Sequence, residues 1–244
     1  MSWQPEIRAA LNNVLNSGAE TKIAVFDADG TIWHDDLGEA FFKYQVQNHL
    51  APGVHNLKDP WQHYRNLCAK DHNLAYGWLA QINSSLPEAT LRSQAQDYYR
   101  RTFRQKVNPD VRDLMGELTL KGFEVWICSA SIHWAIEPSM ADLGLNPAHL
   151  LAVRTKVDEK SIITSELITP LTYRAGKKFQ LEKNLKATPL LVVGNSMGDL
   201  EMLEMAKTLS LVINFLPHLP EIKESEEALL SEARKRKWSV QIFK

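Results

Sequence analysis

The chain has 244 residues, of which 44% are hydrophobic and 23% are charged, and its formal net charge is -1. This balance is ordinary for a globular chain and excludes a disordered or strongly basic protein, so no nucleic-acid or anionic-membrane partner is indicated. Two cysteines are too few for a disulfide framework and predict a reduced, cytoplasmic setting. No apolar run reaches the ~18 residues of a membrane span, and the first residues lack the apolar stretch of a signal peptide.

The first predicted elements are an amphipathic helix over residues 5–17 and an apolar strand over 22–26. The helix follows from apolar residues at helical spacing, which are Ile7, Leu11, Val14 and Leu15. The strand leads directly into the polar, glycine-containing segment Asp27-Ala-Asp-Gly-Thr31. In α/β proteins the segment that follows a strand is a common place for chemistry.

Residues 37–108 predict a helical insertion, because they are rich in Gln, Asn, Tyr and Trp and contain few β-branched runs. After residue 109 the α/β pattern resumes with a helix over 110–121. Predicted strands follow over residues 123–128 and near 150–154, 190–193 and 209–213, with a hairpin near 154–168. We therefore predict an α/β fold with a mainly parallel sheet, in which residues 1–36 and 109–244 form the core and residues 37–108 form a helical cap inserted after the first strand.

Asp27 and Asp29 have the chemistry and the spacing needed for phosphoryl transfer. A carboxylate such as Asp27 can accept a phosphoryl group and form an aspartyl-phosphate. In an extended segment Asp29 points to the same side as Asp27, so it can act first as general acid and then as base for the hydrolytic water. Gly30 permits the sharp turn out of the strand. The alternative is a plain polar turn; a calcium-binding loop does not match at its remaining positions.

Three further polar groups follow other predicted strands. The hydroxyl of Ser129 could donate to a phosphate oxygen, or it could merely cap a helix. Lys177 or Lys178, at the start of a helix, could neutralise the phosphate and Asp27, or either could be solvated. Asp199, near a helix N-terminus, could be a cap or could hold Mg2+. In an open parallel sheet all these positions converge on one crevice, which favours a shared site over independent coincidences.

These residues resemble the motifs of the haloacid dehalogenase superfamily, over a stretch that runs from Lys22 to about Phe215. The four matching segments, in order, are Phe26–Thr31, Ile127–Ser129, Gly176-Lys177 and Gly194–Asp199. The resemblance implies a Rossmann-like core and a phosphate-transfer enzyme. It also implies Mg2+ bound by Asp27, by the backbone carbonyl of Asp29 and by residues of the fourth segment.

Asn195 departs from the family pattern, which usually places an acidic residue directly after the first glycine of the fourth segment. An amide oxygen can still ligate Mg2+, but without charge. Either Asn195 is a weaker ligand or Asp199 holds the metal without it. Asp29 matches the second aspartate that dehalogenases lack, so the resemblance favours phosphatase chemistry.

The position of the insertion resembles the phosphoserine phosphatase-like branch, and the finer pattern resembles its phosphocholine and phosphoethanolamine phosphatase relatives. Acidic residues soon after the first motif, together with Trp33, suit a cationic group on the substrate, although the acids could simply begin a helix. We therefore expect a small phosphorylated metabolite that bears an amine. The predicted substrate-binding residues are Gly30, Thr31, Trp33, Asp36, Glu39, Ala130 and Ser131.

Two other functions remain open at this stage. A phosphosugar mutase would keep the same motifs but return the phosphate to the substrate. A non-catalytic binding protein of the same fold is disfavoured by the intact Asp27, Asp29, Ser129 and Lys177, whereas Asn195 supports it. For any of these functions the chain is expected to be a monomer or a homodimer.

Overall fold

The computed structural model describes residues 3–244, and within them six parallel strands form one sheet in the order β3-β2-β1-β6-β7-β8. Their bounds are Ile23–Phe26 (β1), Glu124–Ile132 (β2), Leu150–Val153 (β3), Leu191–Gly194 (β6), Leu209–Phe215 (β7) and Ser239–Phe243 (β8). The predicted α/β fold with a mainly parallel sheet is confirmed.

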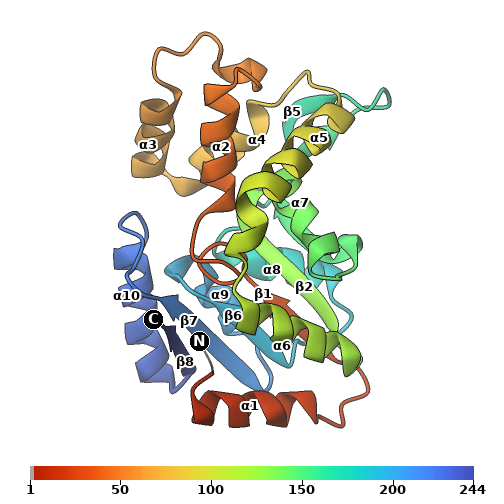
Figure 1. Ribbon diagram of the computed structural model, residues 1–244, viewed down its shortest axis with the longest axis vertical. Helices are drawn as coiled ribbons and strands as arrows, with labels where there is room; N and C mark the ends of the chain where they lie inside the picture. Colours follow the sequence, from red (N-terminus) through yellow and green to blue (C-terminus); the bar gives the residue numbers. More distant parts are fainter. Residues whose placement is uncertain (1–2) are drawn as a thin grey trace.

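Helices cover both faces of the sheet (Figure 1). One face packs against α1 (Pro5–Leu15), α6 (Pro109–Leu120) and α7 (His133–Asp142), and the other against α8 (Ala175–Asn184), α9 (Leu200–Leu203) and α10 (Lys223–Arg236). Alternate residues of β1 therefore enter two different apolar cores: Ala24 and Phe26 one, Ile23 and Val25 the other. This double burial explains why the central strands read as continuous apolar runs.

A helical layer lies over one end of the sheet (Figure 1). It contains α2 (Leu37–Gln47), a short turn (Pro52–Val54), α3 (Pro60–Lys70), α4 (His72–Gln81) and α5 (Glu88–Tyr98), and it returns to the sheet through the turns Tyr99–Phe103 and Arg104–Lys106. Its centre is an aromatic cluster of Phe42, Trp61, Tyr64 and Trp78. Trp61 and Trp78 thus pack inside the helical layer.

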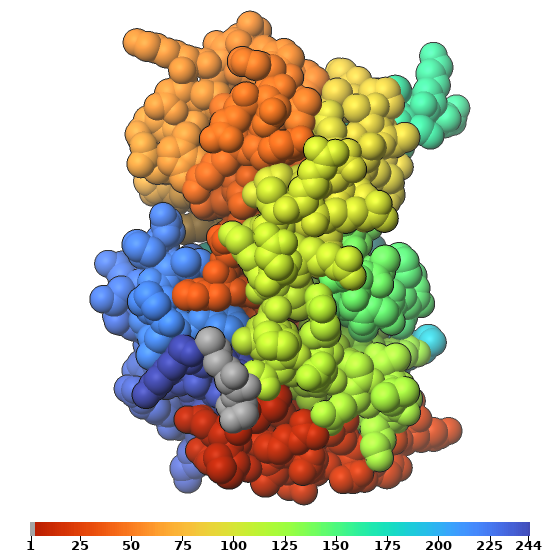
Figure 2. All heavy atoms as spheres, in the orientation of Figure 1, coloured from red at the N-terminus to blue at the C-terminus, as the bar shows by residue number. Residues whose placement is uncertain are grey.

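A second chain segment joins this layer. The hairpin of β4 (Thr155–Val157) and β5 (Ile163–Leu167) belongs to the segment that the sequence assigns to the core. Its backbone nevertheless bonds to the helical layer: Ser85 N donates to Ile163 O at 2.8 Å, and Ile163 N donates to Leu86 O at 2.9 Å. In Figure 2 the orange and yellow atoms of the helical layer lie above the sheet layer, and atoms of the blue C-terminal part lie directly below the orange ones.

The strand β8 is missing from the sequence-based prediction. It follows the basic cluster Arg234–Lys237 at the end of α10 and pairs with β7 at the sheet edge. Phe243 packs against Trp3 and Phe215, so this strand closes the core near the N-terminal helix. Within residues 3–244 no helix has the length and apolar character needed to cross a membrane.

The contact between the turn Pro52–Val54 and the end of α4 gives a stability prediction. A Cβ on Gly53 would lie 2.6 Å from the Ile82 Cα, so Gly53→Ala should lower the free energy of unfolding by about 1–3 kcal/mol. Gly116 lies inside α6 with open space around it, so Gly116→Ala should raise the same quantity by about 0.5–1 kcal/mol. Urea unfolding measures both, and equal signs for the two variants would contradict the packing described.

Candidate active site

The carboxyl ends of β1, β2 and β6 open into a cavity of about 310 Å³ that the helical layer roofs. Asp27 and Asp29 come from the segment after β1, Ala130 and Ser131 from the end of β2, and Asn195 to Asp199 from the segment after β6. Residues of α2 and α4 line the opposite side. The convergence predicted for a parallel sheet is thus present in the structure.

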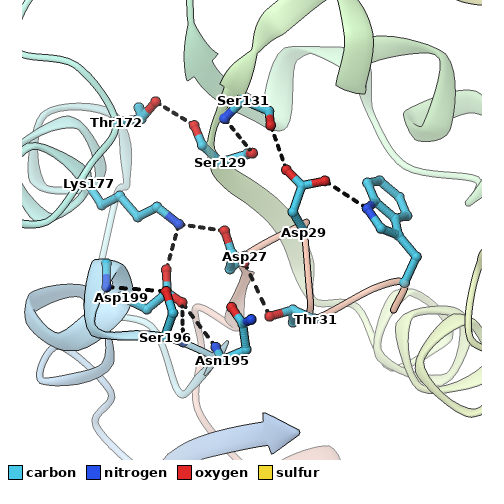
Figure 3. A network of polar contacts seen from close by, with 12 residues as sticks. Asp27, Asp29, Thr31, Ser129, Ser131, Thr172, Lys177, Asn195, Ser196 and Asp199 are labelled. Atoms are coloured by element: carbon cyan, nitrogen blue, oxygen red, sulfur yellow. Dashed lines mark hydrogen bonds and ion pairs between the residues drawn. The ribbon is translucent and has the colours of Figure 1, made fainter. Parts of the chain in front are cut away.

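Lys177 lies at the floor of this cavity, in the first turn of α8 (Figure 3). Its Nζ lies 2.5 Å from Asp27 Oδ1 and 2.6 Å from Asp199 Oδ1, and the residue is 2% exposed. Lys178 instead faces outward, near Glu182. The structure therefore selects Lys177 from the two lysines that the sequence left open.

Burial and charge shift the protonation of this group of residues. Burial raises the pKa of Asp27 to about 7, with Asp199 acting in the same direction and the ammonium of Lys177 opposing it. Burial favours the neutral amine of Lys177, but the carboxylates of Asp199 and Asp27 outweigh it and raise the pKa of Lys177. We therefore treat Lys177 as a permanent cation shared by two carboxylates.

Asp199 has both of its carboxylate oxygens engaged. Oδ1 accepts from Lys177, and Oδ2 accepts from the backbone N–H groups of Asn195 and Ser196 at 3.0 and 3.2 Å. Ser196 accepts in turn from Gly198 N, which completes a capping box at the start of the short helix Met197–Asp199. Asp199 is therefore a helix cap and a partner of Lys177, and its role as a metal ligand stays a prediction.

Asp29 is held by three donors. Its Oδ1 accepts from Leu37 N at 2.7 Å and from Trp33 Nε1 at 2.8 Å, and its Oδ2 accepts from Ser131 Oγ at 2.6 Å. Burial raises the pKa of Asp29, while the hydrogen bonds from Ser131, Leu37 and Trp33 oppose the rise. A carboxyl group with a raised pKa and a fixed direction suits a general acid.

Trp33 does not line the cavity. Its ring is fully buried edge-on against Phe103, at a centroid distance of 5.5 Å, and its indole N–H is used by Asp29. The predicted contact between Trp33 and a substrate cation is therefore not available, because the ring face is covered by protein. Its place in the structure is that of a support for Asp29.

Ser129 is fully buried and does not line the cavity either. β2 extends to Ile132, so Ser129 lies within the strand and not at its end. Its hydroxyl accepts from Ser131 N at 3.0 Å, and its carbonyl accepts from Thr172 Oγ1 at 2.5 Å. The neighbouring Ala130 and Ser131 take the place in the cavity wall that the sequence gave to Ser129.

Gly30 and Thr31 shape the loop without lining the cavity. Thr31 Oγ1 lies 3.3 Å from Asp27 Oδ2. Gly30 has a φ of 75°, and a Cβ there would lie 2.0 Å from Asn195 Nδ2, so glycine is required both by the backbone conformation and by the approach of Asn195. These two residues are therefore supports of Asp27 and Asn195.

The donors around Asp27 suit Mg2+ by their chemical kind. Across residues 3–244 no three His, Cys, Asp or Glu side chains are grouped as a metal site. The side chains of Asp27 and Asn195 line the cavity, and the packing of Asn195 on Gly30 brings its amide against the Asp27–Asp29 loop. Their side-chain oxygens, together with the backbone carbonyl of Asp29 that the family resemblance adds, are the kind of donors that a hard cation such as Mg2+ prefers.

The roof of the cavity is acidic. Asp36, Glu39 and Glu221 line it together with the cation Lys43. Asp36 caps α2 by accepting from Glu39 N at 2.7 Å, so the helix-capping alternative for this residue is also present. Burial, and then Asp29 and Glu39, raise the pKa of Asp36 well above its usual value. Burial raises the pKa of Glu39, while Lys43 and a hydrogen bond from Tyr64 oppose the rise.

Comparisons with known proteins were made for sequence and for structure. A family model described as haloacid dehalogenase-like hydrolase matches residues 24–204. Comparison with curated proteins finds no similar sequence. Similar solved structures include a functionally unknown conserved protein from Anaerococcus prevotii (TM-score 0.73, 16% identity, 98% of this chain and 92% of that one). A protein of unknown function from Bordetella pertussis is also similar, with a TM-score of 0.70 and 16% identity over 91% of this chain and 98% of that one. The structure of a substrate-bound phosphoserine phosphatase matches with a TM-score of 0.54 and 17% identity over 89% of this chain and 99% of that one.

The raised pKa of Asp36 gives a pH prediction. A folded-state pKa above the unfolded one contributes stability at low pH that is lost as the pH rises through the folded pKa. Asp36→Asn keeps a capping oxygen but cannot ionise. The stability gained by the variant over the unaltered protein should therefore grow between about pH 4 and about pH 8 in urea unfolding. Asp59→Asn, at the exposed cap of α3, is the matched control. A gain in the free energy of unfolding that stays constant across this pH range would contradict the raised pKa of Asp36.

Proposed function

Because the chain belongs to the haloacid dehalogenase-like hydrolase family, we propose that it is a Mg2+-dependent phosphatase that uses Asp27 as its nucleophile. The observation that carries this proposal is the buried ammonium of Lys177 between Asp27 and Asp199, with Asp29 two residues from Asp27 in the same cavity. The phosphoserine phosphatase among the similar structures supports the proposal. The substrate is a small phosphomonoester that bears an amine.

The two oxygens of Asp27 have different surroundings. Oδ1 is bound by Lys177, whereas Oδ2 has only the long contact with Thr31 at 3.3 Å among the polar contacts of the described residues. Oδ2 is therefore the oxygen that attacks phosphorus. The new O–P bond forms as the bond from phosphorus to the leaving oxygen breaks, and the product is an aspartyl-phosphate.

Asp29 completes the proton transfers. In its protonated form it donates to the leaving oxygen, and as a carboxylate it then takes a proton from the water that attacks the aspartyl-phosphate. This second attack releases phosphate and restores the Asp27 carboxylate. The three hydrogen bonds to Asp29 hold its direction through both steps.

Lys177 and a bound cation provide the positive charge in the proposed site. Lys177 offsets the negative charge of Asp27 and Asp199, which would otherwise repel an incoming phosphate. Asp27, the Asp29 carbonyl and Asn195 would hold Mg2+, which would supply positive charge to offset the negative charge of the phosphate. Ser131 and Ala130, at the end of β2, line the wall of the cavity.

The amine on the substrate is proposed from the roof of the cavity. We assign residues 37–108 to a cap. Glu39 of this cap and Asp36, directly before it, bring carboxylates to the roof of the cavity. Burial raises the pKa values of these half-buried carboxylates, and repulsion by neighbouring acids, which include Glu39 for Asp36 and Glu221 for Glu39, adds to the rise. A cationic group on the leaving alcohol relieves that repulsion, whereas a second anion increases it.

Substitution of the two aspartates tests the reaction. Asp27→Asn should abolish phosphate release, because the amide is nearly isosteric but is a poor nucleophile. Asp29→Asn should lower kcat by at least ~100-fold, the usual scale for a general acid. Release of phosphate from a panel of phosphomonoesters with Mg2+ measures both, and circular dichroism checks folding. Near-normal turnover by Asp27→Asn, or conversion of a sugar phosphate to an isomer without phosphate release, would exclude the proposed hydrolase.

A substrate comparison tests the amine. The unaltered protein should prefer phosphoserine, phosphoethanolamine or phosphocholine over phosphomonoesters whose alcohol part is neutral or anionic. Glu39→Gln should lower kcat/KM for the cationic substrates by about tenfold, equal to about 1.4 kcal/mol, with little change for the neutral ones. Glu117→Gln, on the far helix α6, is the control. An equal loss on all substrates, or a preference for sugar phosphates, would refute the amine assignment.

A further inference from the structure

Glu226 is a buried acid that the proposed reaction does not use. It lies in the first turn of α10 and is 3% exposed. Its Oε1 accepts from Asn195 Nδ2 at 3.1 Å, and its Oε2 lies 2.5 Å from His218 Nδ1. Glu226 does not line the cavity, but Asn195 does. The side chain of Asn195 therefore stands between Glu226 and the cavity.

The contact with Glu226 determines which way the Asn195 amide faces. An ionised carboxylate can only accept hydrogen bonds, so it must meet the NH2 group of the amide and not its oxygen. Asn195 Nδ2 also lies against Gly30, where an added Cβ would come within 2.0 Å of it. The amide oxygen is then directed away from Glu226, and Figure 3 draws it on the side of Asp27 and Asp199.

We infer that Glu226 is a positioning residue that turns Asn195 Oδ1 toward the cation, an inference that rests on the proposed Mg2+ dependence. Groups behind a metal ligand commonly fix its orientation and raise its donor strength. Here the neutral amide replaces the acidic residue usual in this family, and a carboxylate stands directly behind it. The pair therefore places a carboxyl group one side chain behind the proposed metal position.

This arrangement predicts how Asn195→Asp changes the affinity for the metal. In the unaltered background the new carboxylate would face Glu226, and two acceptors without a proton between them repel. Asn195→Asp alone should therefore fail to tighten metal binding, although a carboxylate is the better ligand. With Glu226→Gln added, the amide of Gln can donate to the new carboxylate, whose other oxygen is free for the metal.

The experiment measures binding of Mg2+ alone by calorimetry, with Mn2+ and electron paramagnetic resonance as a second probe of the same site. The proteins are the unaltered chain, Asn195→Asp, Glu226→Gln and the double variant. Glu226→Gln should weaken binding about tenfold, since a Gln side chain no longer dictates the orientation of Asn195. The double variant should bind at least about tenfold more tightly than Glu226→Gln. Glu227→Gln, next along the same helix and exposed, should leave the affinity unchanged.

The outcomes separate this inference from the proposed function. An equal gain from Asn195→Asp in both backgrounds, or an unchanged affinity in Glu226→Gln, would overturn the inference while leaving a metal-dependent phosphatase in place. Metal binding with the expected dependence but no phosphate release would instead contradict only the proposed function. No binding of either cation to the unaltered protein would contradict both. Should Asn195→Asp fail to fold, the comparison of Glu226→Gln with Glu227→Gln still decides.

Discussion

The ammonium of Lys177 is the interaction on which the rest of the site depends. It is buried with two carboxylates, Asp27 and Asp199, that follow two adjacent strands of the sheet. Burying a charge is costly unless it is paired and hydrogen-bonded, so removal of one partner would leave the others uncompensated. The bridge therefore ties the start of α8 to the segments after β1 and β6. It also leaves Asp27 Oδ2, whose contact is the long one with Thr31, as the less engaged of the two oxygens.

The floor of the cavity combines Lys177 with the carboxylates of Asp27, Asp29 and Asp199, whereas the roof is mainly acidic. The roof contains Asp36, which is the N-cap residue of α2, and Glu39 in the first turn of that helix. Such a roof costs stability, because partial burial of the two carboxylates and repulsion by neighbouring acids both disfavour their charged forms and raise their pKa values. Perturbed groups of this kind concentrate at functional sites, where a ligand of opposite charge relieves the repulsion. An amine on the proposed substrate would bring such an opposite charge to the roof.

Much of this could be predicted from the sequence, because the catalytic positions depend on a single geometric fact. The carboxyl ends of parallel strands converge, so Asp27, Asp29 and Lys177 could be brought together from their places after predicted strands. The remaining details depend on packing between distant segments. The direction of the Trp33 ring depends on its packing against Phe103, and the burial of Ser129 depends on the extension of β2 to Ile132. The contact of Glu226 with Asn195 depends on α10 lying beside the segment after β6. Glu226 and Thr172 carry no local signal: each lies far along the chain from its partner.

In the proposed reaction, Asp27 itself carries the phosphoryl group during turnover. The most direct measurement is to mix the protein with Mg2+ and a substrate that it hydrolyses, quench in acid within one turnover, and locate any phosphoryl adduct by peptide mass spectrometry. The account predicts an adduct on Asp27 that is lost on treatment with hydroxylamine, as an acyl phosphate should be, and that is absent when substrate is omitted. Rapid turnover with no adduct, or with an adduct on Ser131 or another residue, would contradict it.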